Sequence, residues 1–189
     1  MDFGEEVVTM ALGAILAHSV ALPKGRLRKG ITLGAPEIAT LLAAGIERVT
    51  VARLGAQDVH EDAAALALAR ALVPEPEAAG LVLRAMGTGR VNILAAQAGI
   101  TRLNPAQIHA LNATHPMITL ATVPQWHRMD PGDMVGTVKI ISYGVPQTAL
   151  TKACAEARNG LSLCSAKLQN VVLLQTIVGA DDGEKGQHV

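Results

Sequence analysis

The chain has 189 residues, of which 50% are hydrophobic but only 2% aromatic, and its 16 basic residues balance its 16 acidic residues. This length suffices for one domain or for two small ones, with a core of Ala, Val, Leu and Ile. The neutral net charge argues against a general nucleic-acid binder, which needs a basic surface. We also expect no membrane segment, because no uninterrupted run of about 18 apolar residues occurs.

The cysteines and histidines do not form a metal-binding pattern. Cys154 and Cys164 lack a neighbouring Cys/His cluster with zinc-site spacing, and the six histidines are scattered. We therefore predict no metal site, and we interpret both cysteines as reduced, buried thiols of a cytoplasmic protein. The start of the chain, Met1–Glu6, is acidic. This argues against a signal peptide, whose first residues are basic.

The first part of the chain alternates strands with helices. An apolar run predicts a strand over residues 13–22, and alternating apolar residues predict another over 48–54. A helix is expected to begin near Pro36, because proline suits the first helical turn. A second helix, rich in Ala and Leu, is predicted over 60–72, with Asp58 as its capping residue.

The rest of the chain is richer in strands, and the two prolines within residues 73–79 mark a boundary before it. Two further helices are expected, over 104–112 and 147–158, the first with Asn104 as its cap. The expected strands are 81–85, 91–95, 99–103, 116–123, 134–143 and 171–178.

This order of elements predicts an α+β fold with two small lobes. Residues 1–76 form a β-α-β-α lobe, and residues 77–150 form a mostly β, barrel-like lobe. Residues 151–189 supply a helix, a terminal strand and a loose tail. An unpaired apolar strand invites pairing with another chain, so the strand over 171–178 predicts a homo-oligomer.

The segment Gly87-Thr88-Gly89-Arg90 has two interpretations. It can present backbone N–H groups to a phosphate, with Arg90 adding positive charge. Alternatively it is a hairpin turn with an exposed arginine. It lacks the lysine and hydroxyl of a P-loop and the third glycine of a dinucleotide-binding motif.

Two other basic features have the same ambiguity. Lys139 lies in the middle of an apolar strand, where an unpaired ammonium is costly, so it either has a partner or reaches water along its stem. Arg26, Arg28 and Lys29 cluster beside a turn, where they meet an anionic ligand or are simply solvated. No serine lies in a nucleophile elbow, and no paired acid and base is evident, so the residues alone name no reaction.

Six segments, taken in their order and spacing, carry a resemblance to a known family. They are 13–18 (GAILAH), 27–30 (LRKG), 35–54, 89–93 (GRVNI), 118–124 (ITLATVP) and 132–141 (GDMVGTVKII). Together they resemble the front half of molybdopterin-binding proteins, which are relatives of the molybdopterin molybdotransferases of molybdenum-cofactor assembly. The resemblance spans about residues 10–178.

The resemblance implies a module for molybdenum-cofactor biosynthesis or binding. Its ligand would be molybdopterin, a small anionic pterin, or molybdate, with Mg²⁺ as an additional cofactor to consider. Arg90 and Lys139 would contact the anion, Asn92 and Thr88 would form hydrogen bonds to it, and Lys29 would add a more distant charge. Any catalysis would be of the molybdotransferase type.

The chain departs from that family after residue 178, because the strands, helices and glycine-rich pterin site expected further on are absent from its sequence. The module would then act with a separate protein that carries a molybdopterin-binding domain. The alternatives are a non-catalytic structural or dimerisation module, or a fragment of a larger molybdopterin-binding protein. A small-molecule sensor domain is a third interpretation.

Overall fold

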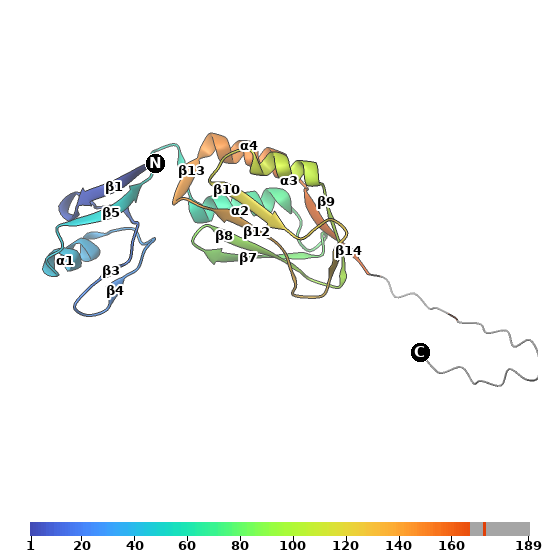
Figure 1. Cartoon of the computed structure of the whole chain (residues 1–189), viewed down its shortest axis with the longest axis horizontal. Helices are drawn as coiled ribbons and strands as arrows, with labels where there is room; N and C mark the ends of the chain where they lie inside the picture. Colours follow the sequence, from blue (N-terminus) through green and yellow to red (C-terminus); the bar gives the residue numbers. More distant parts are fainter. Residues whose placement is uncertain (167–171, 173–189) are drawn as a thin grey trace, which may run out of the picture.

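The computed structural model describes residues 1–166 and residue 172. The fold is a mixed α+β fold, as expected, and the described strands pair antiparallel in several small sheets. Two lobes lie side by side along the long axis (Figure 1), each with its own apolar core. Within the described part of the chain, no helix is long and apolar enough to cross a membrane.

The first lobe is a three-stranded sheet covered by one helix. Helix α1 (Ala35–Ala43) begins as predicted, with Pro36 in its first turn, and the Glu37 carboxylate accepts a hydrogen bond from the backbone N–H of Gly34 at 3.0 Å. The sheet has the order β1-β5-β2, and its strands are β1 (Asp2–Val7), β5 (Arg48–Arg53) and β2 (Ile15–Leu16). The core of this lobe draws on residues 8–51.

The single strand predicted over 13–22 is wrong, because the chain changes partner within it. β2 pairs with β5, whereas β3 (Val20–Ala21) pairs with β4 (Arg26–Leu27) in a separate hairpin. The edge strand β1 was missed, because five of its six residues are exposed, half of them are acidic, and they lack an apolar alternation.

The second lobe contains a four-stranded antiparallel sheet of order β10-β12-β8-β7. The sheet is open, with β10 and β7 at its edges, so these strands do not close the barrel that we expected. Buried residues alternate with exposed or half-buried ones along β8 and β12, so one face lies on the core and the other faces outward. The strands are β10 (Ile118–Thr122), β12 (Met134–Ile140), β8 (Arg90–Ala95) and β7 (Leu81–Gly87).

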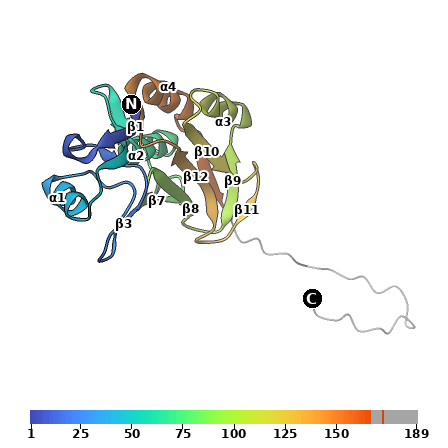
Figure 2. The same ribbon diagram turned by 60° about the vertical axis from the view of Figure 1, so that its left-hand side comes forward.

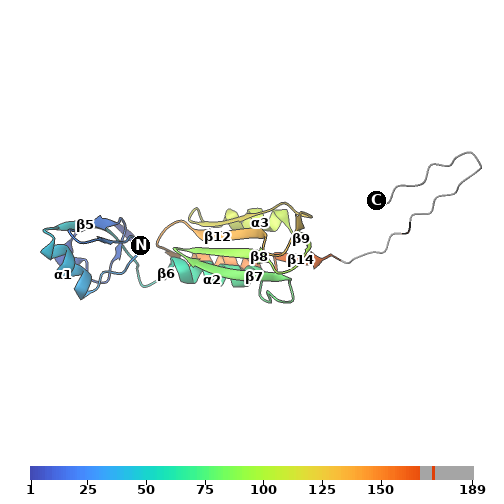
Figure 3. The ribbon, with the colours of Figure 1, turned by 90° about the horizontal axis from the view of Figure 1, so that it is seen from below.

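Helices α2 (Glu61–Leu72), α3 (Pro105–Asn112) and α4 (Gln147–Ala157) complete this lobe. Figure 3 shows α2 running along β7 and β8, and five apolar residues of α2 belong to the core of the second lobe. The sequence placed this helix in the first lobe, within residues 1–76. The two cores instead divide between residues 51 and 64, because the apolar stripe of α2 finds its sheet downstream in the chain.

A second, three-stranded sheet of order β11-β9-β14 lies at the far end of the second lobe, beneath α3 (Figure 2). Its strands are β11 (Arg128–Met129), β9 (Gly99–Leu103) and β14 (Leu161–Ser165). β14 was not predicted, because Asn159 and Gly160 indicate only the end of the preceding helix. The strand predicted over 171–178, and with it the basis for a homo-oligomer, lies outside the described residues except for Val172.

Candidate functional site

Lys139 and Arg90 are direct cross-strand partners on β12 and β8. Side chains in this relationship share one face of an antiparallel sheet, so the fold brings together the two cations that the sequence singled out. Like charges directly opposite each other repel, and such a pair therefore needs a compensating group. For Lys139 that group lies at the start of α2.

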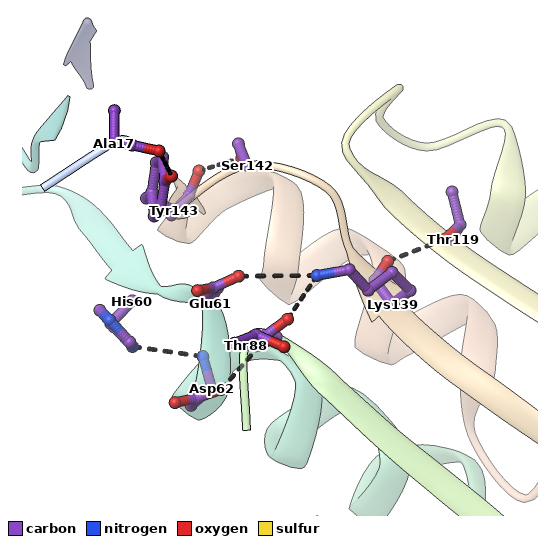
Figure 4. Close-up of polar contacts among 11 residues, drawn as sticks. Ala17, His60, Glu61, Asp62, Thr88, Thr119, Lys139, Ser142 and Tyr143 are labelled. Carbon is purple, nitrogen blue, oxygen red and sulfur yellow. Dashed lines mark hydrogen bonds and ion pairs between the residues drawn. The ribbon is translucent and has the colours of Figure 1, made fainter. Parts of the chain in front are cut away.

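The ammonium of Lys139 is held by two partners at the end of the sheet (Figure 4). Its Nζ lies 3.6 Å from Glu61 Oε2, and it donates a hydrogen bond to the backbone carbonyl of Thr88. The Glu61 side chain is only 8% exposed and that of Lys139 28%, so this ion pair is well shielded from water. Of the two alternatives left open for Lys139, the structure shows the one in which it has a partner, and that partner, Glu61, was not among the predicted site residues.

The segment Gly87–Arg90 is a two-residue hairpin, in agreement with the alternative interpretation. Thr88 and Gly89 have φ values of 52° and 68°, and Gly87 pairs with Arg90. The N–H of Gly89 donates to Asp62 Oδ1 at 2.7 Å. The carboxylate of Asp62 therefore already takes the turn N–H that we had assigned to a phosphate.

The start of α2 differs from the prediction. Asp58 does not cap the helix, because it lies in β6 (Asp58–His60), which pairs with β13 (Gly144–Pro146). The capping residue is His60, whose Nδ1 accepts from the N–H of Asp62 at 3.3 Å. This two-stranded pairing directs Glu61 toward Lys139, and the N–H of Glu61 donates to the carbonyl of Tyr143 at 2.9 Å.

Burial raises the pKa of the Glu61 carboxyl above its ordinary value, and the neighbouring Lys139 opposes this rise in part. The same buried surroundings raise the pKa of the Tyr143 phenol, with a smaller contribution from Glu61. The phenol donates a hydrogen bond of 2.6 Å to the carbonyl of Ala17 in the first lobe. The contacts of Glu61, Lys139 and Tyr143 thus join the start of α2 to the hairpin and the second lobe to the first.

The outward face of the four-stranded sheet carries cations without matching carboxylates. Arg84 and Arg90 are exposed there, and neither forms an ion pair within residues 1–166. Asn92 neighbours both: it is the cross-strand partner of Arg84 and lies two residues after Arg90 on β8, and its partner on the other side is Thr137. The Thr137 hydroxyl donates to Asn92 Oδ1 at 3.0 Å, so among the described residues the hydrogen bond of this amide is made by its oxygen and not by its N–H groups.

The five predicted site residues are only partly brought together. Arg90, Lys139, Asn92 and Thr88 lie on or beside β8 and β12, whereas Lys29 belongs to the first lobe, where its backbone N–H donates to Ser19 Oγ. Lys29 is separate because its hairpin packs on the other core. Glu61 and Asp62 were missed as site residues, although an acidic pair at a helix start was a visible signal.

Among the described residues, no group of three His, Cys, Asp or Glu side chains is close enough to hold a metal ion. The two carboxylates at the start of α2 are already engaged, Glu61 with Lys139 and Asp62 with the N–H of Gly89.

Both cysteines are free, but Cys164 is exposed and Cys154 half-buried, so the expectation of two buried thiols is wrong.

Comparison with known proteins adds one match. A family model described as a domain of unknown function, DUF8806, matches residues 7–53. This range ends where β5 ends and contains the core of the first lobe. No curated protein and no solved structure is significantly similar to the chain.

Proposed function

We propose that the chain is a binding module of molybdenum-cofactor assembly that holds a small anionic pterin, or molybdate, on the outward face of its four-stranded sheet. The observation that supports this best is the juxtaposition of Arg90 with Lys139 across β8 and β12. Arg90 is exposed and forms no ion pair among the described residues, whereas Lys139 already pairs with Glu61, so an anion that binds Arg90 relieves the remaining repulsion between the two cations.

The roles of the residues follow from their contacts. Arg90 and Arg84 supply guanidinium groups, which match the oxygens of a phosphate or molybdate in a bidentate way. Asn92, next to both, supplies amide N–H donors. Lys139 positions the hairpin and adds positive potential, while its ammonium is engaged by Glu61 and Thr88.

The wider proposal rests on the resemblance to molybdopterin-binding proteins. Under this proposal the chain acts in the cytoplasm, as a homo-oligomer or with a protein that supplies the molybdopterin-binding domain. Any molybdotransferase reaction would use that second domain. The residues described above fit an oxyanion, and we assign them no bond-breaking step.

Titration calorimetry with a stable phosphorylated pterin and with molybdate tests the proposal. Arg90→Ala and Arg84→Ala each remove a charge-assisted contact of about 1.5–3 kcal/mol and should weaken binding about ten- to a hundredfold. Arg26→Ala, an exposed arginine of the first lobe, is the matched control and should bind as wild type does. The proposal fails if wild type does not bind either anion at millimolar concentration, or if all three variants bind equally.

One observation favours the alternative function, a non-catalytic structural module. One of the two cations beside the hairpin, Lys139, is engaged internally by Glu61, and this ion pair fastens α2 to the sheet. Absence of anion binding together with a strong loss of stability in Lys139 variants would favour this second function.

A further inference from the structure

A polar hollow of about 390 Å³ lies at the end of the second lobe, away from the basic sheet face. Three separate segments form it: β9 with the start of α3, the loop over residues 124–127, and the connection from α4 to β14. Its volume falls within the range of small-molecule sites, roughly 300–1,000 Å³.

Trp126, the only tryptophan of the chain, lines this hollow. Its side chain is 61% exposed and its φ is 65°, in the left-handed region. That conformation costs a bulky residue on the order of 1–3 kcal/mol and persists only where the surroundings impose it. Packing in the core does not explain this strained backbone, because the indole is exposed.

The buried residue Thr101 imposes this conformation. Its carbonyl accepts from the N–H of Trp126 at 2.9 Å, and its hydroxyl donates to the carbonyl of Pro124 at 2.8 Å. The same hydroxyl accepts from the N–H of His127 at 2.9 Å. Thr101 is fully buried, so the loop is fastened to β9 on both sides of Trp126 and the indole stays on the surface.

The opposite wall is fixed in a similar way. Asn159 has a φ of 53°, and its N–H donates to the carbonyl of Ala71 at 3.1 Å. Gln107 Nε2 donates to the carbonyl of Arg158 at 2.9 Å, which ties α3 to the same connection. Among the described residues other than glycine, three have a positive φ, and two of them, Trp126 and Asn159, line this hollow.

The charge on the lining of the hollow is positive. Arg102 is its only charged lining residue, and no carboxylate lies among the lining residues. Ser162, the cross-strand partner of Arg102, places a hydroxyl beside the guanidinium. Gln125 and Asn159 add amides, which both donate and accept hydrogen bonds.

We propose that this hollow binds a small ring-bearing anion. The flat face of the ring stacks on the indole of Trp126, and the anionic group binds Arg102 and Ser162. The amides of Gln125 and Asn159 bind polar substituents of the ring. Aromatic stacking contributes about 1–3 kcal/mol for a nucleobase, and an arginine contact to an oxyanion a similar amount, so both halves of the ligand are needed. The site is independent of the one on the sheet face.

Tryptophan fluorescence reports on this site alone, because the chain has one tryptophan. Guanosine 5′-monophosphate and glucose 6-phosphate are the two ring-bearing anions to titrate. Guanosine, glucose and inorganic phosphate each lack one half of the required chemistry. We expect a saturable change with at least one of the two phosphates, and binding at least tenfold weaker for its ring alone and for inorganic phosphate. Which phosphate binds identifies the ring as a nucleobase or a sugar.

Two variants complete the test. Arg102→Gln should weaken the binding at least tenfold, whereas Arg128→Gln, whose side chain is 84% exposed and lies outside the hollow, should leave it unchanged. Trp126→Ala, followed by calorimetry, should weaken it to a similar degree. The proposal is overturned if neither phosphate changes the fluorescence at about 10 mM, if inorganic phosphate acts as well as they do, or if the two arginine variants bind equally. Arg90→Ala should not alter this binding, because Arg90 lies outside the hollow. This variant therefore distinguishes binding in the hollow from anion binding on the sheet face.

Discussion

Gly89 and Glu61 are in contact: a Cβ atom added to Gly89 would lie 2.7 Å from Glu61 Oε2 and 2.9 Å from the carbonyl oxygen of Ile140. The hairpin between β7 and β8 therefore approaches the start of α2 so closely that only glycine fits. The Lys139–Glu61 ion pair lies directly beside this contact.

Replacement of Gly89 by alanine should lower the free energy of unfolding by about 2–4 kcal/mol, since it adds both a steric overlap and the strain of a positive φ. Gly87→Ala is the matched control, because Gly87 has a φ of 74° but no atom within 4 Å of an added Cβ. It should lose only about 1–2 kcal/mol. Urea unfolding measures both values, and equal losses would contradict the close approach.

Removal of Lys139 from its pair with Glu61 should destabilise the second lobe. We expect Lys139→Met to lower the free energy of unfolding at pH 7 by about 1–3 kcal/mol, because it leaves the shielded Glu61 carboxylate without its partner. Glu61→Gln should not lower it in this way, because a neutral amide avoids the desolvation of the carboxylate. The double variant should therefore lose less than Lys139→Met alone. Additive losses in urea unfolding would mean that the two side chains do not interact.

The raised pKa of Glu61 gives stability a defined dependence on pH. The folded state binds this proton more tightly than the unfolded state does. The contribution of Glu61 to stability is therefore fully present below the unfolded pKa of about 4.3, and is lost as pH rises through the raised folded value. Relative to Glu61→Gln, wild type should thus be most stable near pH 4 and lose ground toward pH 7. A difference that does not vary with pH would refute this assignment.

The hydrogen bond from the Tyr143 hydroxyl to the Ala17 carbonyl links the two lobes. Tyr143→Phe removes it without changing the ring, and it should cost about 0.5–1.5 kcal/mol at the contact between the lobes. We expect faster proteolysis of the connection over residues 54–57, and little change in the unfolding of the second lobe. Ser142→Ala, next to it, is the control, since the Ser142 hydroxyl donates only to the nearby carbonyl of Gly144. Cleavage at the wild-type rate in both variants would show that the link does not restrain the lobes.

Local signals in the sequence predicted much of the second lobe. Asn104 and Pro105 marked the start of α3, and the structure shows Asn104 Oδ1 accepting from the N–H of Ala106 at 3.0 Å. The glycines around Thr88 marked the hairpin, because both central residues of such a turn need a positive φ. These features depend on residues that are neighbours in the chain, so they can be predicted without knowledge of the fold.

Features that depend on distant partners were not predicted. The sequence left open whether Lys139 has a partner, because Glu61 lies far upstream and only the pairing of β6 with β13 brings it close. The same pairing occupies Asp58, which removes it from the helix cap. The hollow beside Trp126 combines three distant segments, so periodicity and spacing gave no indication of it.

The pairing of β6 with β13 also has a consequence for the order in which the chain folds during synthesis. The first lobe draws its core from residues 8–51, so it can form as soon as that segment has left the ribosome. Helix α2 follows immediately, but β12 and β13, against which it docks, come much later. Its apolar stripe is therefore only partly covered, by β7 and β8, until β12 and β13 emerge, and α2 is open to non-native contacts during that interval.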